Sequence, residues 1–250
     1  MSSLRGRRPR RVVALAAAVL LSATVALAQI EFYSRDPPVH NPPYDGRFTF
    51  ARIRYANEPA LACRPFDRDH DGFIFGESCG AVVIESLESS RRRGLEPYAA
   101  LRGWGIAMDG NRNPDPSLEG ETMAIQNALD GSGWQPAQID YVNPHGTGSI
   151  VGDETELKAL HACGLTGAYL NATKSLIGHG LSAAGAVEVI ATLLQMQAGR
   201  VHPTRNLEDP IDPTLNWVRD QAVDHPIENA LTLSMGFGGI NTALCWQRHH

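Results

Sequence analysis

The sequence has few cysteines and no excess of positive charge. The net charge of its 250 residues is -5, which argues against nucleic acid as the main partner. Four cysteines occur, and no two of them form a CxxC pair: they are Cys63, Cys79, Cys163 and Cys245. This spacing supports neither a zinc site nor a disulfide framework, and no metal is implied.

The composition suits a globular protein. With 43% hydrophobic and 20% charged residues, the chain can bury a real core. Its length suits one large domain or two small ones. We find no internal repeat in the body of the chain.

Residues 1–28 have the pattern of a secretory signal peptide. MSSLRGRRPRR contains five arginines, an uncharged apolar run of 17 residues follows, and Ala26 and Ala28 suit cleavage before Gln29. The run is marginal for a permanent membrane span, which needs about 20 residues. The alternative is an alanine-rich helix that follows a basic tail by chance.

Residues 29–56 differ in composition from the rest of the chain, and we interpret them as a proline-rich linker with one stray strand. Four prolines fall within seven residues, which favours an extended or irregular chain. RFTFARIRY then alternates like a single strand. We assign residues 57–248 to a separate domain.

This domain alternates strands and helices, which is typical of an α/β fold with helices layered on a mixed sheet. We predict a buried strand at CGAVVIESL, strands at YAALRGWGIAMDG and IDYVN, and two strands around a glycine turn in LTLSMGFGGINTALCWQ. We predict helices at LESSRRR before Gly94, at GETMAIQNALDGSG, at GDETELKALHACG with Asp153 and Glu156 as a capping box, and at SAAGAVEVIATLLQMQAG. The last helix should be buried all round, because small or apolar residues occupy nearly every face.

The stretch DRDHDGFIFGES resembles a calcium-binding EF-hand loop at first sight. Asp67, Asp69 and Asp71 occupy the first, third and fifth positions. However, the twelfth position, which needs a bidentate carboxylate, is Ser78, and Glu77 comes one residue early. We therefore favour a polar turn that feeds a strand, and calcium binding stays a minor alternative.

Three further stretches place reactive side chains beside glycines. They are NPHGTGS with His145, TKSLIGHG with Lys174 and His179, and MGFGGIN. His145 follows a predicted strand at its carboxyl end, where α/β folds commonly build sites. Taken singly, each stretch suits an ordinary structural role. Two histidines and a lysine, all beside glycine-rich breaks, together favour a site.

These stretches resemble the motifs of one family, both in their residues and in their order along the chain. CRPFDRDHDGFIFGES, YVNPHGTGSIVGDETE, NATKSLIGHGLSAAGAVE, HPTRNLEDP and SMGFGGINTA together are similar to the β-ketoacyl synthases, the condensing enzymes of fatty-acid and polyketide synthesis. The resemblance covers residues 57–247. It implies an α/β fold that is the incomplete C-terminal half of a thiolase-like fold, which the aspartate-rich turn opens.

The resemblance also implies a reaction. A cysteine nucleophile takes an acyl chain from a carrier protein, and two histidines assist decarboxylation of the malonyl-carrier protein, whose carbanion attacks the thioester. His145 and His179 match the two histidines, Lys174 matches a lysine that supports the site, and Glu188 matches a carboxylate that pairs with this network.

Substrate contacts are implied by the same resemblance. Thr147 and Ser149 match hydroxyls that contact the pantetheine arm. Phe237, which precedes Gly238 in the glycine turn, matches an aromatic residue that gates the acyl pocket. No cofactor of the chain itself is implied, because phosphopantetheine arrives on the acyl carrier protein.

The sequence departs from the family at its nucleophile. None of the four cysteines lies in the family's cysteine-containing elbow, which belongs to the first half of the fold. Met235 and the Asn143-Pro144 pair also differ from the commoner residues. We therefore expect the isolated chain to be inactive and to aggregate, or to pair with a chain or domain that supplies the N-terminal half. The complete enzyme should be a dimer.

Three functions stay open at this point. The first is a carrier-protein-dependent condensing ketosynthase, closest in character to those of polyketide clusters. The second is a homologue that only decarboxylates malonyl-carrier protein, and the third is a non-catalytic exported or partner-binding fragment. A ketosynthase function implies a cytoplasmic protein, whereas the N-terminal segment predicts export. A joined reading frame would explain both.

Overall fold

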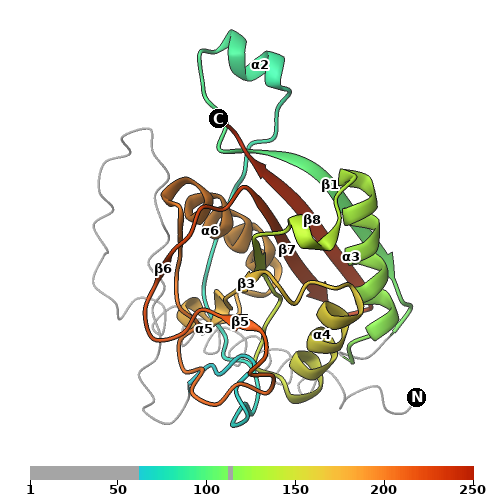
Figure 1. Ribbon diagram of the computed structural model, residues 1–250. Coiled ribbons are helices and arrows are strands. Elements are labelled where there is room, and N and C mark those ends of the chain that lie inside the picture. The colour runs from blue at the N-terminus through green and yellow to red at the C-terminus, as the bar shows by residue number, and fades with distance from the viewer. Residues whose placement is uncertain (1–61, 112–114) are drawn as a thin grey trace, which may run out of the picture. The chain divides into compact units, whose positions relative to one another are not determined.

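The computed structural model describes residues 62–111 and 115–250, which all belong to one structural unit, residues 50–250 (Figure 1). The predictions for residues 1–28 and 29–56 lie outside the described residues. The helices are α2 (Leu87–Arg92), α3 (Leu118–Ser132), α4 (Ile150–Ala162), α5 (Lys174–Ile177) and α6 (Ala184–Ala198). The strands are β1 (Ala99–Met108), β2 (Tyr141–Asn143), β3 (Tyr169–Leu170), β4 (Arg200–Val201), β5 (Asn216–Trp217), β6 (Val223–Asp224), β7 (Asn229–Gly236) and β8 (Ile240–Arg248).

Six of these strands form one mixed sheet in the order β1-β8-β7-β2-β3-β5. The pairs β1–β8 and β7–β8 are antiparallel, whereas β2 pairs in parallel with both β7 and β3, and β3 with β5. Strands β4 and β6 form a separate antiparallel pair. The predicted mixed sheet and the two closing strands are confirmed. Gly238 and Gly239 make their turn with φ of 88° and 82°, a region that favours glycine.

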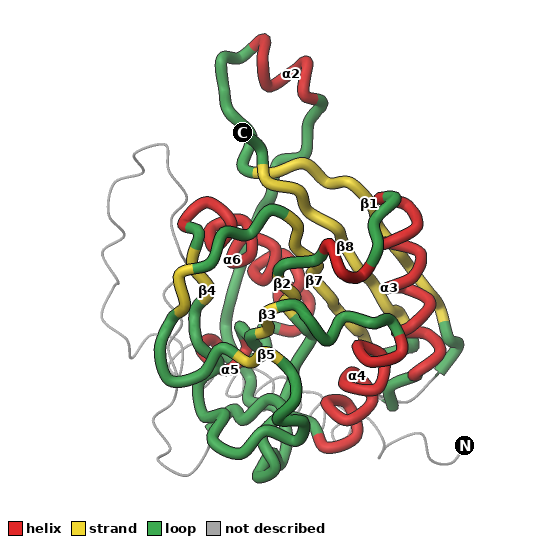
Figure 2. The backbone as a smooth tube through the Cα atoms, viewed as in Figure 1, coloured by secondary structure: helices red, strands yellow, loops and turns green. Residues whose placement is uncertain are grey.

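Helices cover both faces of this sheet (Figure 2). On one face α3 packs on β1. The helix lies so close to Gly103 and Gly105 that a side chain at either position would collide with its backbone. Helix α4 lies next to α3 and completes this core, which includes Ile125, Leu129 and Leu160. On the other face α6 packs against a second core. The buried residues of this core are Tyr141, Val189, Leu193, Met196, Val201, Val218, Ile227, Ala230 and Trp246.

Helix α3 shows why local signals in this sequence predict structure well. The Ser117 side chain accepts a hydrogen bond from Gly120 N at 3.1 Å, and Glu119 lies in the first turn. Gly133 ends the helix with φ of 72°. A side-chain cap, an acidic first turn and a left-handed glycine are all recognisable from sequence.

The prediction that helix α6 is buried all round is wrong. One side is buried, whereas Val187, Ile190 and Leu194 are only half-buried. Among the described residues, the helical stretch Leu181–Ala198 alone has the length and apolar composition of a membrane span. Its buried Glu188 and Gln195 bond to other core residues, which fits a core helix instead.

The predicted buried strand at CGAVVIESL is wrong for the described part of the chain. Residues 79–85 form no strand, and Val83 and Ile84 are 77% and 71% exposed. A β-branched run needs a neighbouring strand for its backbone, and no described residue supplies one. The short helix α2 follows as predicted, with Ser86 as its cap and Gly94 just beyond its end.

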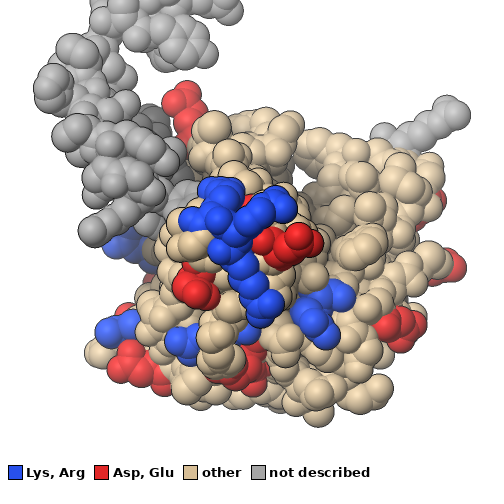
Figure 3. Space-filling model, turned by 90° about the horizontal axis from the view of Figure 1, so that it is seen from above, with Lys and Arg blue, Asp and Glu red and all other residues tan. Residues whose placement is uncertain are grey.

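Helix α2 carries much of the positive charge seen from above (Figure 3). Arg91 and Arg92 lie in its last turn. Acidic neighbours partly balance them, since Arg92 pairs with Glu88 at 3.7 Å and Arg93 with Glu85 at 3.0 Å. These pairs are exposed and contribute little to stability.

Candidate functional site

The structure brings four of the predicted site residues together beside the sheet. His145 follows β2 at its carboxyl end, Lys174 begins α5, His179 follows α5, and Glu188 lies on α6. The rings of His145 and His179 are nearly perpendicular, with centroids 5.4 Å apart and an interplanar angle of 84°. Two loops and two helices therefore build one site.

Lys174 is the centre of this cluster. Lys174 and Glu188 are each 1% exposed, and their Nζ and Oε1 atoms lie 2.5 Å apart. The same ammonium donates to the His145 carbonyl oxygen and lies 3.2 Å from His145 Nδ1. Burial raises the pKa of Glu188 to about 7, and Lys174 opposes this rise. Each charge would be costly at this depth without the other.

Both histidines are neutral, and both have the same tautomer. Burial and then Lys174 lower the pKa of His179 to about 4, and burial, Lys174 and His179 hold the pKa of His145 well below its usual value. An ammonium group only donates, so it makes Nδ1 of His145 an acceptor. Nδ1 of His179 accepts from Leu181 N at 3.2 Å. The proton of each ring therefore lies on Nε2, and two N–H donors are available to a developing oxyanion.

The loop that carries His145 is fixed by two carboxylates of α4. Glu156 accepts from the backbone N–H groups of His145 at 2.6 Å and Gly146 at 2.8 Å. Asp153 accepts from Gly148 N at 3.0 Å and Phe66 N at 2.6 Å. The predicted capping box is therefore wrong. The helix begins earlier, after Ser149, and both carboxylates bond to loops outside it.

The remaining predicted contact residues lie in two places. Thr147 donates to the Ser149 hydroxyl at 2.9 Å, within the His145 loop. Phe237 lies in the β7–β8 turn, where the residue is 66% exposed. The backbone of this turn bonds to Asp109, through Gly239 O at 2.9 Å, and no described contact joins Phe237 or Gly238 to the histidines.

A buried polar network behind the histidines escapes sequence reasoning. The Tyr141 hydroxyl donates to Asn171 Oδ1 at 2.5 Å and accepts from Gln195 Nε2 at 2.9 Å. Asn143 Nδ2 donates to Thr173 Oγ1 at 2.6 Å. The network links β2, the start of α5 and α6, the elements that hold the site. Polar residues inside apolar runs were its only sequence signal.

Three of the four cysteines lack the properties of a nucleophile. Burial raises the pKa of Cys63, Cys163 and Cys245 to about 11, so these thiols stay protonated at neutral pH. Cys63 comes nearest to the His145 loop, and its Sγ donates to Thr147 O at 3.6 Å. Cys79 is exposed.

The aspartate-rich turn uses its first carboxylate structurally. Asp67 accepts from Asp69 N at 3.0 Å, Glu208 N at 2.6 Å and Asp209 N at 2.9 Å. Burial alone would raise the pKa of Asp67, but these N–H groups and Arg64 lower it. Across residues 62–111 and 115–250, no three His, Cys, Asp or Glu side chains gather as metal ligands. These contacts fit the polar-turn interpretation.

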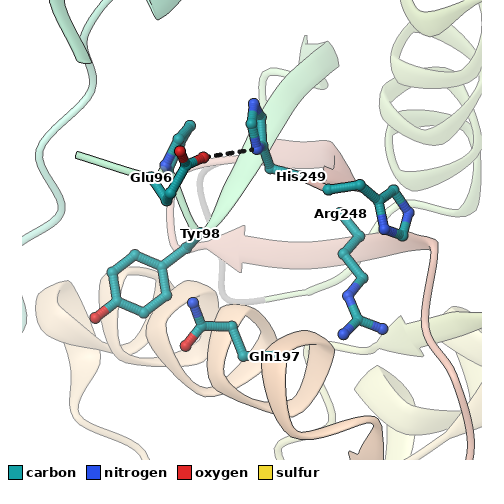
Figure 4. Close-up of a pocket in the computed structure, with 7 residues that line it drawn as sticks. Glu96, Tyr98, Gln197, Arg248 and His249 are labelled. Carbon is teal, nitrogen blue, oxygen red and sulfur yellow. Dashed lines mark ion pairs between the residues drawn. The ribbon is translucent and has the colours of Figure 1, made fainter. Parts of the chain in front are cut away.

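One cavity of about 480 Å³ lies apart from these residues, at the carboxyl end of α6 (Figure 4). His249 and Glu96 form an ion pair at 3.5 Å on its wall. Its lining residues are Glu96, Pro97, Tyr98, Gln197, Arg248, His249 and His250. It contains none of the predicted site residues.

Comparison with known proteins gives consistent matches. Residues 98–208 match the family described as beta-ketoacyl synthase, C-terminal domain, and residues 44–90 match beta-ketoacyl synthase, N-terminal domain. The second match includes the aspartate-rich turn, which the motif resemblance assigns to the second half of the fold. The boundaries predicted at residues 28 and 56 stay predictions.

Curated relatives match most of the chain. The polyketide biosynthesis malonyl-ACP decarboxylase PksF of Bacillus subtilis (strain 168) is 63% identical over 194 residues, 78% of this chain and 47% of that protein. The 3-oxoacyl-[acyl-carrier-protein] synthase 2 of Staphylococcus aureus (strain COL) is 40% identical over 209 residues, 80% of this chain and 50% of that protein. The chain thus spans about half the length of these relatives.

Solved structures give the same result. The ishigamide ketosynthase/chain length factor superposes with a TM-score of 0.72 at 34% identity, over 76% of this chain and 48% of that one. A type II polyketide ketosynthase, AntDE, in complex with its acyl-carrier protein AntF superposes with a TM-score of 0.69 at 30% identity, over 78% and 49%.

Proposed function

This chain belongs to the β-ketoacyl synthase family of condensing enzymes, and we propose that it carries the half-site that decarboxylates malonyl groups delivered on an acyl carrier protein. The predicted fold, an incomplete thiolase-like fold with helices on a mixed sheet, is confirmed by the solved relatives.

One observation carries the proposal of decarboxylation. Identity to a malonyl-ACP decarboxylase is 63% over 194 residues, whereas the 3-oxoacyl synthases are 37–40% identical. The sequence alone puts condensation first and decarboxylation second. The difference in identity supports the opposite order.

The chemistry of the site supports the same order. In decarboxylation the bond between the malonyl carboxylate and the α-carbon breaks, CO₂ leaves, and the electron pair moves into the thioester as an enolate. The enolate oxygen would accept from Nε2–H of His145 and His179, and this stabilisation exists only as the charge develops. A proton from water on the α-carbon then gives an acetyl thioester. No cysteine is required.

Condensation is the second candidate, because the relatives include 3-oxoacyl synthases. It needs a thiolate that holds the acyl chain, and general acid-base groups do not replace this covalent carrier. The buried thiols of this chain have their pKa raised to about 11. The proposed source of that cysteine is the N-terminal half of the fold, on the same or another chain.

A bare apolar surface supports the proposal that a second half docks here. Trp104, Ile106 and Met108 of β1 are 62%, 57% and 67% exposed. Ile106 is paired with Thr242, which is paired with Ser234, so these residues share the sheet face that α6 covers farther along. We propose that the N-terminal ketosynthase half covers this face beside α6, and that the complete enzyme is a dimer.

The acyl carrier protein is the proposed macromolecular substrate, as in the relative solved with one. The phosphopantetheine arm would arrive on it, and Thr147 and Ser149 would contact that arm. Phe237 and Gly238 would border the acyl pocket. The proposed function implies a cytoplasmic enzyme, because carrier-protein chemistry belongs in the cytoplasm. A non-catalytic exported fragment is the alternative, and the N-terminus of the mature protein discriminates the two.

The test is reconstitution. The full chain is co-expressed with the N-terminal half of the Bacillus relative, and the purified complex is incubated with malonyl-carrier protein. Intact mass of the carrier protein should show conversion to acetyl-carrier protein. A β-ketoacyl product after addition of acyl-carrier protein would instead support condensation. An unchanged malonyl mass with a well-formed complex would contradict both enzymatic candidates.

A further inference from the structure

We propose that residues 72–76, here called the strap, are a positioning element that holds His179 in place beside His145. This inference rests on the proposed function, because it explains how the two proposed donors keep their geometry. The strap is the central part of the stretch that resembles a calcium loop by sequence.

Backbone hydrogen bonds join the strap to both histidine loops. Gly76 N donates to His179 O at 3.0 Å, and His179 N donates to Ile74 O at 2.7 Å. Phe75 and His179 thereby form an isolated parallel bridge. At its other end, Gly72 N donates to Gly148 O at 2.9 Å, in the loop of His145. The strap therefore connects the loop of His145 to the loop of His179.

Glycines on both sides permit this close approach. A Cβ on Gly76 would collide with the carbonyl oxygen of Ile177, which is backbone and cannot rotate away. A Cβ on Gly178, where φ is 70°, would lie 3.0 Å from both Gly76 N and Ile74 O. Any side chain at these positions would separate the strap from the His179 backbone.

The strap also packs an aromatic ring on the His179 imidazole. The centroids of Phe73 and His179 are 5.4 Å apart with an interplanar angle of 73°, and Phe75 packs on Phe73 at 5.1 Å. Burial is the main cause that lowers the pKa of His179 to about 4. Phe73 contributes to that burial, so it keeps the ring neutral as well as in position.

The aspartate-rich turn anchors the strap to the rest of the protein. Asp67 accepts from the backbone of Glu208 and Asp209, and His70 Nδ1 lies 3.3 Å from the Asp153 carboxylate. Asp153 also accepts from Gly148 N. These bonds join the turn and the strap into one element, residues 67–76, here called the brace. Of the three aspartates that give the pattern its resemblance to a calcium loop, Asp67 is the one whose carboxylate makes the bonds to Glu208 and Asp209.

Hydrogen exchange on the full chain tests the backbone contacts. In Gly76→Ala the amide of His179 loses its partner, and exchange in the peptide that covers residues 173–181 should accelerate at least about 10-fold. Glu77→Gln, at the exposed neighbouring position, is the control and should leave exchange unchanged. Unchanged exchange in Gly76→Ala, with β7 and β8 still protected, would overturn the proposal.

A chemical probe tests the packing of Phe73 on His179. It uses a different variant, so it still tests the strap if Gly76→Ala does not fold. Diethylpyrocarbonate acylates imidazole in its neutral form and not in its protonated form, so the rate of modification of His179 reports the protonation of that ring. In the natural chain this rate should be flat between pH 5.5 and 7.5. In Phe73→Ala it should fall about two-fold or more at pH 5.5, because the pKa rises toward its usual value. A flat profile in Phe73→Ala would contradict the role of the strap.

Neither measurement requires enzymatic activity. Failure of decarboxylation in the reconstituted complex would therefore remove the proposed function and leave the brace intact. Conversely, active enzyme with no change in either probe would remove the brace alone. In active enzyme, Phe73→Leu should lower kcat more than it changes KM, because a misplaced donor weakens the stabilisation of the transition state.

Discussion

At the scale of single residues, the Lys174–Glu188 pair decides the state of the site. Both side chains are 1% exposed; Lys174 bonds to Glu188 Oε1, and Oε2 has no hydrogen-bond partner among the described residues. The pair itself adds little net stability, because desolvation offsets the attraction. Its value lies in the ammonium, which fixes the tautomer of His145 and disfavours protonation of both imidazoles.

Removal of the lysine should therefore be costly. Lys174→Met leaves a carboxylate buried without its partner, and we expect a loss of about 3–5 kcal/mol in the free energy of unfolding. Urea denaturation of the dilute full chain measures this. The control is the exposed Lys158→Met on α4, which should change stability by less than about 0.5 kcal/mol. In Lys174→Met/Glu188→Leu much of the loss should be recovered.

The pH dependence follows from His179. Its folded pKa, about 4, lies below the usual 6.5, so the unfolded state binds a proton first on acidification. The stability that comes from the neutral ring is complete above pH 6.5 and is lost as the pH falls toward 4. Between pH 7 and 5 the natural chain should lose about 1–2 kcal/mol more than His179→Asn does. Equal losses would mean that the ring titrates normally in the folded protein.

At the scale of elements, close contact between α3 and β1 is the clearest packing requirement. Gly105→Ala would place a methyl group against the Ala124 carbonyl, and we expect a loss of about 1–3 kcal/mol. Gly167→Ala, with open space around it, serves as the control. If both variants unfold at the same urea concentration, the described packing of α3 is wrong.

The elements also show what sequence can predict. Helix α3 and the β7–β8 hairpin were predictable because Ser117, Gly133 and the glycine turn act locally. The strand at Val83 and Ile84 was not, because a strand requires a neighbour that no described residue provides. The mistaken capping role of Asp153 has a similar cause, since its direction depends on a loop far away in sequence.

The site shows the same division. Their position beside glycine-rich breaks marked His145, Lys174 and His179 as candidates, and the family resemblance indicated the role of each. Phe73 was missed, because its contact with His179 spans more than a hundred residues.

At the scale of the whole molecule, the bare face of β1 controls the behaviour of the chain. Large side chains exposed along one strand face favour association. We expect the full chain to elute from gel filtration as large assemblies, and Trp104→Lys/Ile106→Lys to elute smaller. Gln126→Lys/Asn127→Lys on α3 adds the same charge elsewhere and should not. Elution of the natural chain as a monomer at the same concentration would contradict this account.

The most direct test of the central claim uses the reconstituted complex and malonyl-carrier protein. The measurement is the rate at which the carrier protein changes to its acetyl form, for the natural chain and for His145→Ala and His179→Ala. The account predicts acetyl-carrier protein from the natural chain and a loss of about 100-fold or more in each variant. Undiminished acetyl formation in both variants would contradict it.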